Sequence, residues 1–418
     1  MRLKPNPANS ATDKDFPPPA DRAHLHVLTL TPFFPALENE VGGCFVKEPL
    51  DALAELGVAS TVIAVNPLHH RRRHPSPAGA AEFIRYPQIP GTIGLSSAGR
   101  FLYARLLREV THMHRERPID VIHAHAALPC GQATSLLARR LRIPYVVTVH
   151  GLDVFNTCFL AGAPAEWRRR TSAAAYESAS TVVCVSRKVK QILQGGAHGG
   201  VHSAVVYNGT DPELFSPGPP SYSSNSGGLA NDPRSEILIV GNLIPSKGQE
   251  LVLRAIHRVA AAFPQLQCRI IGEGPDRTRL EALSSELGIR QRIHFLGRQS
   301  RAAVADAMRR CSVFVLPSRN EGLGCVYLEA MACAKPVIAC RGQGIEEIVE
   351  HQKNGWLISP DNLDELTQAM STFLRSPGMA SQIGESARQT VLKGLTLSHQ
   401  AQQLAAIYRD VSAASLAA

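Results

Sequence analysis

Short apolar runs alternate with segments of helical periodicity along most of the chain. The run at 24–30 is rich in β-prone residues, and apolar residues from Phe45 to Leu56 then recur at helical spacing until Gly57 interrupts them. A second β-prone run follows at 60–65, so strand, loop, helix and strand form a βαβ unit, the building block of a parallel sheet. The same alternation predicts further strands at 121–124, 144–149 and 181–185 and helices at 134–141 and 167–178.

The composition of the chain changes at 208–235, where Pro, Gly, Ser and Asn dominate, and we interpret this segment as a linker. The αβ alternation restarts at 236–240, and a helix follows in which apolar residues from Val252 to Phe263 share one face. We therefore expect an α/β fold with two Rossmann-like domains that face each other across a cleft. Later elements are predicted as strands at 267–271, 293–296, 313–316 and 336–339 and as a closing helix at 398–414.

This pattern divides the chain into five predicted parts. A length of 418 residues agrees with two domains and their connections, because a typical domain occupies roughly 150 residues. We expect the last part, a helix, to cross back to the first domain. The parts are a disordered lead at 1–22, an N-terminal Rossmann-like domain at 23–207, the linker at 208–235, a C-terminal domain at 236–395 and a C-terminal helix at 396–418.

The composition excludes several classes of protein. With 44% hydrophobic and 19% charged residues, the chain suits a globular protein with sizeable cores. No apolar run approaches the roughly 18 residues that a membrane span needs, and the N-terminus lacks the apolar core of a secretory signal, so we expect a cytoplasmic protein. The 9 cysteines are scattered without a Cys-x-x-Cys pair, which indicates neither a disulfide framework nor a zinc site.

Most of the net charge of +9 belongs to the N-terminal half. Residues 1–210 carry 23 Lys and Arg against 15 Asp and Glu, whereas residues 211–418 carry 21 against 20. Arginine clusters at 71–73 and 168–170 would suit an anionic membrane surface or substrate, and the predicted helix at 96–114 intersperses apolar residues with arginines, as an amphipathic surface helix does. A solvated basic face and a core-packed helix explain the same features equally well. We expect no nucleic-acid partner, because the arginines are not interleaved with exposed aromatics.

Two strand–loop–helix transitions carry the residues of a candidate site. In open parallel sheets, ligands bind beyond the carboxyl ends of the strands, where helix N-termini favour anions. The segment 241–248 follows a strand and opens a helix, which places Lys247 where an ammonium could meet phosphate oxygens. Taken alone, such a lysine is more often a solvent-exposed residue at the start of a helix.

The segment 316–330 carries the denser signal. Gly322 and Gly324 follow a strand, so the backbone there can approach a ligand closely and its N–H groups can point at a diphosphate. Glu321 and Glu329 flank the start of the following helix with 7 residues between them. The alternative is that the first carboxylate is an ordinary helix-terminal charge and the second a surface residue.

In this order, the motifs resemble the retaining glycosyltransferases of family 4, which have the GT-B fold. The two carboxylates, the segment 241–248 and the sequence IGEGP at 271–275 carry the resemblance in the C-terminal half. It extends from about His24 to the last helix and is specific for the family rather than for one substrate. In the N-terminal half it rests on VGG at 41–43, DVIHAH at 120–125, a segment at 144–153 that ends in HGLD, VS at 185–186 and YNGTD at 207–211.

The resemblance implies that a nucleotide-sugar donor binds mainly to the C-terminal domain and that the N-terminal domain holds a glycan or glycolipid acceptor. Lys247 would neutralise the donor diphosphate, and Glu329 would hydrogen-bond the ribose hydroxyls. Glu321 would hold the sugar and phosphates together with the backbone of three following residues, namely Gly322, Leu323 and Gly324.

From the N-terminal domain, the resemblance implies that Gly43 closes over the phosphates and that His150 contacts the sugar near the reacting centre. The implied catalytic residues are therefore His150, Glu321 and Lys247. One position departs from the pattern, because many relatives carry Arg where this chain has Asn242. We expect weaker donor binding, or a substitute cation such as Arg319, rather than an inactive protein.

We expect neither a metal nor a cofactor, since the nucleotide sugar is a co-substrate. A lysine and helix N–H groups can stabilise a leaving diphosphate without a metal. His123 and His125 lie two positions apart after a predicted strand, and such a pair more often serves packing than metal binding. Retention, which the resemblance implies, would not need a carboxylate nucleophile, because the departing phosphate can accept the proton of the acceptor.

The sequence thus predicts a retaining, metal-independent hexosyltransferase that glycosylates a lipid-linked or polysaccharide acceptor, cytoplasmic or peripheral at the inner membrane face. Two other classes stay open. A non-catalytic nucleotide-sugar-binding or scaffold protein of the same fold would bind the donor without turnover. A nicotinamide-dependent oxidoreductase shares the Rossmann texture, although the first loop lacks Gly-x-Gly-x-x-Gly.

Overall fold

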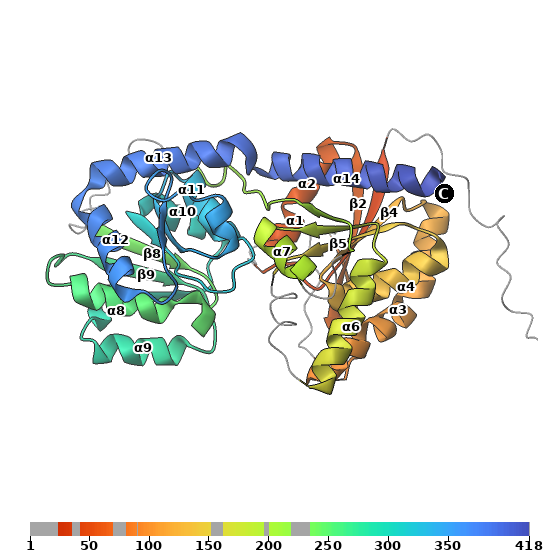
Figure 1. The fold of residues 1–418 in the computed structure, drawn as a ribbon, viewed down its shortest axis with the longest axis horizontal. Coiled ribbons are helices and arrows are strands. Elements are labelled where there is room, and N and C mark those ends of the chain that lie inside the picture. Colours follow the sequence, from red (N-terminus) through yellow and green to blue (C-terminus); the bar gives the residue numbers. More distant parts are fainter. Residues whose placement is uncertain are drawn as a thin grey trace, which may run out of the picture.

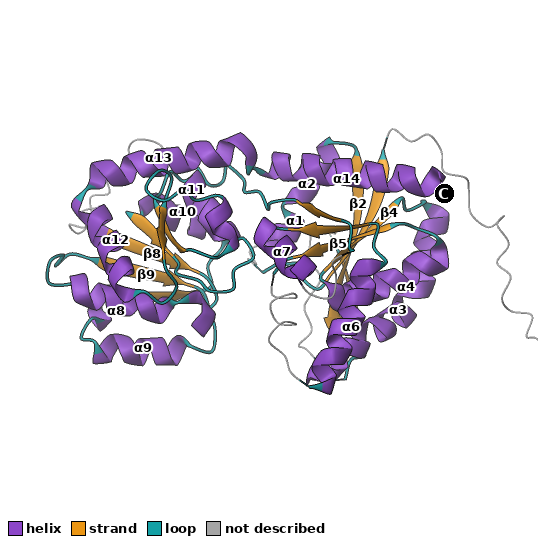
Figure 2. Cartoon of the chain, in the orientation of Figure 1, coloured by secondary structure: helices purple, strands orange, loops and turns teal. Residues whose placement is uncertain are grey.

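A computed structural model describes residues 24–35, 42–69, 81–89, 91–151, 162–195, 200–218 and 235–417. The predicted lead at 1–22, the arginine cluster at 71–73 and most of the predicted linker, 219–234, lie outside these residues. The chain forms two parallel sheets, each flanked by helices, as Figures 1 and 2 show. The predicted α/β fold with two Rossmann-like domains is therefore confirmed.

The N-terminal sheet has seven parallel strands in the order β3-β2-β1-β4-β5-β6-β7. Strand β1 lies at its centre, with Val27 opposite Ser60 of β2 on one side and Val121 of β4 on the other. Nearly every residue of β1, β4 and β5 is buried, because helices cover both faces of such a sheet. The strands are β1 (Leu25–Thr31), β2 (Val58–Pro67), β3 (Glu82–Tyr86), β4 (Val121–His125), β5 (Tyr145–Val149), β6 (Thr181–Cys184) and β7 (Ser203–Val205).

The helix predicted after the first strand is divided into two. A first turn, α1 (Cys44–Lys47), ends before Pro49, and α2 (Pro49–Glu55) begins there, because proline lacks an N–H but fits the first position of a helix. A π-helical turn, Ala127–Gly131, precedes α4. The other helices of this domain are α3 (Gly91–Glu116), α4 (Gln132–Leu141), α6 (Ala163–Glu177) and α7 (Arg187–Gly195).

Most of the apolar residues that recur along helix α3 are buried inside the protein. Leu102, Leu106 and Val110 are fully buried in the core, and only Phe101 of this set is exposed, at 40%. Of the two interpretations of this helix, the structure therefore favours core packing. Any contact of α3 with a membrane would rest on its arginines and on one aromatic ring.

The C-terminal sheet has six parallel strands in the order β10-β9-β8-β11-β12-β13. Its short edge strand β13 was not predicted, and neither were β3 and β7 of the other sheet. Helix α8 ends at Val259, so the predicted helical face stops before Phe263. The strands are β8 (Glu236–Val240), β9 (Gln267–Ile271), β10 (Ile293–Gly297), β11 (Val313–Val315), β12 (Val337–Cys340) and β13 (Trp356–Ile358).

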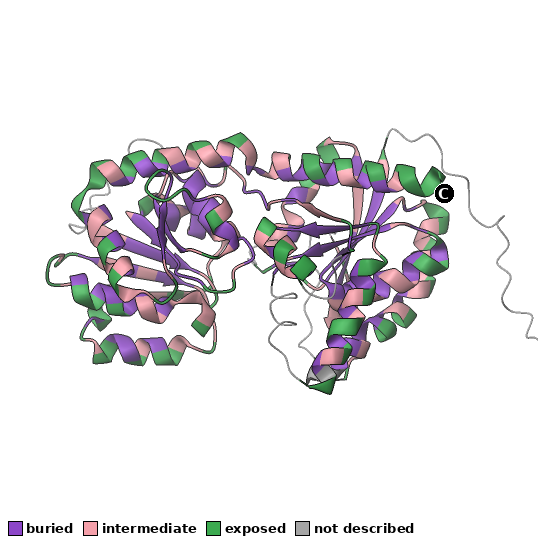
Figure 3. Cartoon of the chain, viewed as in Figure 1, coloured by how far each residue is buried: buried purple, intermediate pink, exposed green. Residues whose placement is uncertain are grey.

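Helices cover both faces of this second sheet, and 3-10 turns at Pro245–Lys247, Arg290–Arg292 and Gly344–Glu347 connect its elements. Figure 3 shows the strands buried beneath half-exposed helices. No helix of the described chain has the length and apolar character needed to cross a membrane. The helices of this half of the chain are α8 (Gln249–Val259), α9 (Arg277–Glu286), α10 (Arg301–Arg310), α11 (Cys325–Ala332), α12 (Leu363–Arg375), α13 (Pro377–Gly394) and α14 (Leu397–Ala417), of which α14 lies on the N-terminal domain.

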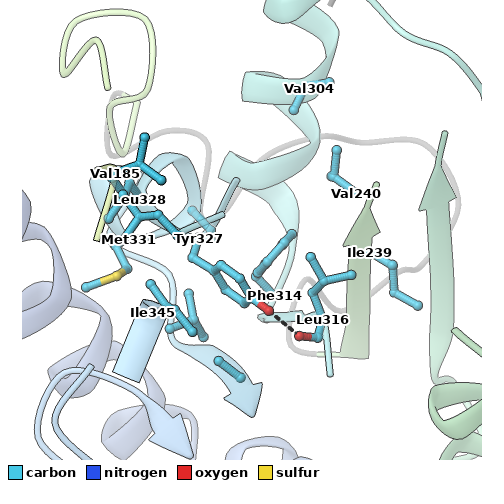
Figure 4. Packing of buried hydrophobic residues seen from close by; sticks show 14 of the residues in the cluster. Val185, Ile239, Val240, Val304, Phe314, Leu316, Tyr327, Leu328, Met331 and Ile345 are labelled. Atoms are coloured by element: carbon cyan, nitrogen blue, oxygen red, sulfur yellow. Dashed lines mark hydrogen bonds between the residues drawn. The ribbon is translucent and has the colours of Figure 1, made fainter. Parts of the chain in front are cut away.

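One cluster of buried apolar residues runs through both domains and includes Val185, after β6, and Leu328 of α11. Tyr327 lies at its centre, where its hydroxyl donates a hydrogen bond to the carbonyl of Leu316, and its ring packs edge-on against Phe314 (Figure 4). This contact fixes the start of α11 against the end of β11. The cluster thereby anchors the loop that lies between them.

The first residues of the predicted linker, 208–218, are packed against the C-terminal domain. Phe215 is fully buried, and Arg309 of α10 donates hydrogen bonds to the carbonyls of Leu214 and Ser216 at 2.5 and 3.1 Å. Residues 208–218 are held in place by contacts with a helix that is distant in the sequence. The Pro- and Gly-rich composition of the segment therefore does not predict that it is packed.

Helix α14 crosses from the C-terminal domain onto the N-terminal domain, as expected (Figure 1). It packs along α2, and Leu404 and Tyr408 join a buried cluster with Val27 and Val121 of the N-terminal sheet. The end of the chain therefore supplies part of the core of the first domain.

Candidate active site

The loops that follow strands of the two sheets meet at the domain boundary. Ser186, after β6, donates a hydrogen bond from its hydroxyl to the carbonyl of Gly322, after β11, at 2.6 Å. A methyl group added to Gly322 would lie 2.4 Å from the carbonyl oxygen of His150, which follows β5. The two domains are thus in close backbone contact at the predicted sugar-binding loop.

Lys247 and Glu321 form an ion pair although they lie 74 positions apart. Ser318 donates a second hydrogen bond to the Glu321 carboxylate at 3.1 Å. The pairing requires two loops to touch, and Gly248 permits this because its φ is +73° and an added Cβ would lie 2.4 Å from the Pro317 carbonyl. The side chains of the pair are 21% and 15% exposed, so Lys247 is not the solvated lysine of the alternative interpretation.

Glu329 is 2% exposed, on the first turns of α11. One carboxylate oxygen accepts a hydrogen bond from Arg301 at 2.6 Å. The other, Oε2, is buried and has no hydrogen-bond partner among the residues that the structure describes. Glu329 is therefore not the surface residue of the alternative interpretation.

The glycine loop fits its predicted role as a close-contact segment. Gly324 has a φ of +85° and immediately precedes α11, so its conformation is one that a side chain would strain. Leu323 is buried, and it anchors the loop between the two glycines. The backbone from Gly322 to Gly324 therefore passes between the domains with little room for side chains.

Asn242 and Arg319 lie on the two loops that meet at Lys247. The side chain of Asn242 is exposed, while its carbonyl accepts a hydrogen bond from Gln249 at 2.9 Å. The backbone N–H of Arg319 donates to Ser246 at 2.6 Å, and its guanidinium pairs with Asp361 at 3.0 Å. Arg319 is thus close to the lysine loop in the fold but already shares its charge with a carboxylate.

His150 is enclosed by aromatic rings. It stacks on His125 at a centroid distance of 5.2 Å, and Phe45 lies 4.7 Å from it. The Nε2 of His150 and the Nδ1 of His125 share a hydrogen bond of 2.9 Å. Burial lowers the pKa of His150 to about 3, so the ring is neutral at physiological pH.

Gly43 lies directly before α1 and against the backbone of Phe33, whose ring is 5.8 Å from that of His150. Its φ is +87°, and an added Cβ would lie 2.6 Å from backbone atoms of both Phe33 and Phe34. Only glycine fits such a position without displacing the backbone. The predicted phosphate-covering loop is thus held close to the end of β1.

His123 and His125 lie in the interior of the N-terminal domain. The ring of His123 shares hydrogen bonds with the hydroxyls of Thr148 at 2.6 Å and Tyr408 at 2.7 Å. The described residues include no group of three or more potential metal ligands. A cavity of about 20 Å³ lies among His123, His125, His150 and Tyr408, which is enough for one water molecule. The eight cysteines that the structure describes are all free.

Polar contacts that the sequence does not predict join the two domains. Arg301 of α10 pairs with Glu48, 253 positions away. Glu347 accepts hydrogen bonds from the backbone N–H groups of Arg187 and Lys188 at 2.8 and 2.6 Å and from the Tyr207 hydroxyl at 2.8 Å. A single sequence gives no local signal for pairs so far apart.

Comparisons with known proteins agree with this arrangement. Residues 45–214 match the family model "Glycosyltransferase Family 4", and residues 225–390 match "Glycosyl transferases group 1". An uncharacterized glycosyltransferase of Methanocaldococcus jannaschii is 31% identical over 271 residues, which are 65% of this chain and 70% of that protein.

Two further relatives match over most of the chain. A D-inositol 3-phosphate glycosyltransferase of Stackebrandtia nassauensis is 27% identical over 89% of this chain and 87% of its own length. TuaC of Bacillus subtilis, whose name assigns it to teichuronic acid biosynthesis, is 26% identical over 94% and 100%. Among solved structures, HepE of Anabaena in complex with UDP has a TM-score of 0.72 at 20% identity and covers 92% of this chain and 100% of HepE.

Proposed function

The chain belongs to the GT-B glycosyltransferases of families 1 and 4 and uses a nucleotide-sugar donor, and from this premise we propose that it transfers a hexose with retention of configuration and without a metal. We further propose a lipid-linked or polysaccharide acceptor. The donor binds to the C-terminal domain, and the acceptor binds to the N-terminal domain. The catalytic group consists of Lys247, Glu321 and His150.

The observation that carries the proposal is the meeting of Lys247 and Glu321 beside the loop that contacts His150. A departing diphosphate gains negative charge, and a preorganised ammonium together with backbone N–H groups stabilises that charge. The Glu321 carboxylate pairs with this ammonium. A bound diphosphate would take over that role and leave Glu321 for sugar hydroxyls.

Retention is proposed through attack on the face that the diphosphate leaves. The acceptor oxygen forms its bond to the anomeric carbon as the bond to the phosphate oxygen breaks, and the acceptor proton passes to that phosphate oxygen. The neutral ring of His150 can hydrogen-bond the sugar without adding a charge at this centre. No step in this scheme requires a metal ion.

The acceptor is proposed from the relatives and from the charge of the N-terminal half. The name of TuaC points to a polysaccharide, and the positive charge would favour an acceptor at an anionic surface. Because the apolar stripe of α3 is mostly buried, such docking would rest on charge. It should therefore weaken steeply with salt, and binding to anionic vesicles no stronger than to neutral vesicles would refute it.

The test begins with thermal shifts of the purified protein in UDP-, GDP- and ADP-sugars, since a ligand that binds only the native state raises its stability. Transfer and donor hydrolysis are then measured with the stabilising donor, with and without EDTA, and NMR assigns the anomeric configuration of the product. Binding without any turnover, in the wild type as in Lys247→Ala and Glu321→Ala, would instead indicate a non-catalytic donor-binding protein. An inverted product would refute retention.

A further inference from the structure

The guanidinium of Arg301 joins the two domains at Glu329. It makes a two-point contact with Glu48 of the N-terminal domain, from Nε at 2.7 Å and from Nη2 at 3.0 Å. Its remaining nitrogen, Nη1, donates to Glu329 Oε1 at 2.6 Å. One side chain therefore fixes two carboxylates that lie on different domains.

This group is held firmly and is largely removed from water. Arg301 lies over the ring of Phe215 at 4.7 Å, and its side chain is 14% exposed. The two carboxylates raise the pKa of Arg301 despite its burial, so it stays charged. Burial raises the pKa of Glu48, and the positive charge of Arg301 opposes that rise. A planar, always protonated guanidinium suits such two-sided pairing, which a lysine ammonium cannot reproduce.

One carboxylate oxygen of Glu329 accepts no hydrogen bond from the described residues. Its Oε2 is shielded from solvent, and no hydrogen bond from the described residues reaches it. A buried carboxylate oxygen without a donor is costly, and most such atoms in native proteins find a partner. Since this atom lies at the domain boundary, we read it as the acceptor for a donor group that arrives with a ligand.

We propose that Arg301 and Glu48 are positioning residues that orient Glu329 toward a ribose hydroxyl of the donor, so that the N-terminal domain takes part in recognising the nucleotide. The proposal rests on the proposed function. In this proposal, a nucleotide gains access to Oε2 of Glu329 when the two domains move apart. When the domains close over the nucleotide, the ion pair between Glu48 and Arg301 forms again, and Arg301 orients the Glu329 carboxylate.

The test compares binding of UDP, GDP and ADP with binding of their 2′-deoxy forms by calorimetry at one salt concentration. We expect the wild type to prefer the ribose form of the nucleotide that it binds by about tenfold, the value of one hydrogen bond to a charged group. Glu329→Gln, Arg301→Lys and Glu48→Gln should each reduce this preference to about twofold. Circular dichroism confirms that each variant is folded, and the 3′-deoxy form is compared if the 2′-deoxy form binds equally well.

Two control variants distinguish the positioning of the Glu329 carboxylate from a general loss of stability or of domain closure. Glu347→Gln weakens a different interdomain contact, and Arg254→Gln removes an exposed ion pair of α8, so both should keep the tenfold preference. A preference retained in folded Glu48→Gln and Arg301→Lys, or lost equally in Glu347→Gln, overturns the positioning role. A wild type that binds a nucleotide but ignores both ribose hydroxyls overturns the role of Glu329. A wild type that binds no nucleotide overturns the proposed function itself.

Discussion

The two domains contribute different kinds of polar side chains to the candidate site: charged pairs on the C-terminal side and a neutral histidine on the N-terminal side. On the C-terminal face, charged groups are kept and paired, as Lys247 is with Glu321 and Arg301 is with Glu329. On the N-terminal face, His150 lies behind the loop of Gly322, and burial holds its imidazole neutral. The first face suits a charged nucleotide diphosphate, and the second suits a reaction that proceeds beside uncharged hydroxyls.

The difference follows from what surrounds each group. Lys247 has the carboxylate of Glu321 beside it, whereas His150 stacks on a second imidazole and packs against Phe45. Burial without an opposite charge disfavours the protonated form of a histidine. The predictions below test this contrast, in order of decreasing effect.

Removal of the ammonium on the charged face should have the largest effect. We expect Lys247→Ala to lower the rate of sugar transfer about 100- to 1,000-fold, the range seen when one preorganised donor to a developing negative charge is lost. Steady-state product formation measures it. Lys353→Ala is the matched control, because Lys353 is an exposed lysine of the same domain whose partner is Glu350. A loss below about tenfold in folded Lys247→Ala would contradict the assignment.

The neutral face should make the protein sensitive to acid. Burial lowers the pKa of both His123 and His150 to about 3, below the value near 6.5 of an unfolded histidine. The unfolded chain therefore binds more protons, so this stability is complete above about pH 6.5 and is lost as the pH falls toward 3. Each of these histidines should lower the free energy of unfolding by about 1.4 kcal/mol for every pH unit that the pH falls below about 6.

Urea unfolding at pH 7.5, 6.0 and 5.0 measures this dependence. Burial also lowers the pKa of His125, so that ring adds to the measured slope. His123→Asn should destabilise the protein at neutral pH yet reduce the total slope by the share of one ring, about 1.4 kcal/mol per pH unit. His112→Gln is the control, since His112 is exposed and its loss should leave the slope unchanged. A slope that His123→Asn does not alter would mean that this ring is already charged in the folded protein.

The contact between the two faces can be opened by a single methyl group. We expect Gly322→Ala to reduce transfer about tenfold, because its Cβ would lie 2.4 Å from the carbonyl of His150 and would push the domains apart. Nucleotide binding to the C-terminal domain should change less than the transfer rate. Gly378→Ala, which meets no atom within 4 Å, should leave activity unchanged. Equal activity of both variants would show that the domains need not close this far.

The smallest effect is expected from additional charge on the C-terminal face. Asn242→Arg should lower the donor KM about two- to fivefold at low salt, because a partly exposed cation attracts the diphosphate only modestly. The gain should shrink at higher ionic strength. Asn242→Gln, which adds length without charge, should leave the KM unchanged. A similar gain in Asn242→Gln would show that charge is not the cause.

The same contrast explains how much the sequence could predict. The central strands and the loops at Lys247 and Gly322 follow from local patterns, because apolar runs and glycines record backbone requirements directly. The sequence also indicated that Lys247 and Glu321 belong to one site, through the order of the motifs. Their direct ion pair was not predicted, since it depends on two loops that only the sheet brings together.

The contacts between domains could not be predicted from the sequence. Glu48 and Arg301 each look like ordinary helix charges, and their pairing depends on the orientation of one domain relative to the other. The order of 208–218 has the same origin, because Phe215 is buried by a helix that begins 86 positions later at Arg301. The edge strands β3, β7 and β13 escaped prediction because each is short and is ordered by its pairing with a neighbouring strand.

The return of α14 to the N-terminal domain has a practical consequence for dissection of the protein. A fragment that ends before residue 235 would lack α14. The apolar surface that Leu404 and Tyr408 cover would then be exposed, so the fragment should aggregate when expressed alone. Supplying residues 397–417 as a separate peptide should restore its solubility. The two halves are therefore better joined in a permuted order, with the final helix fused to the fragment that it covers.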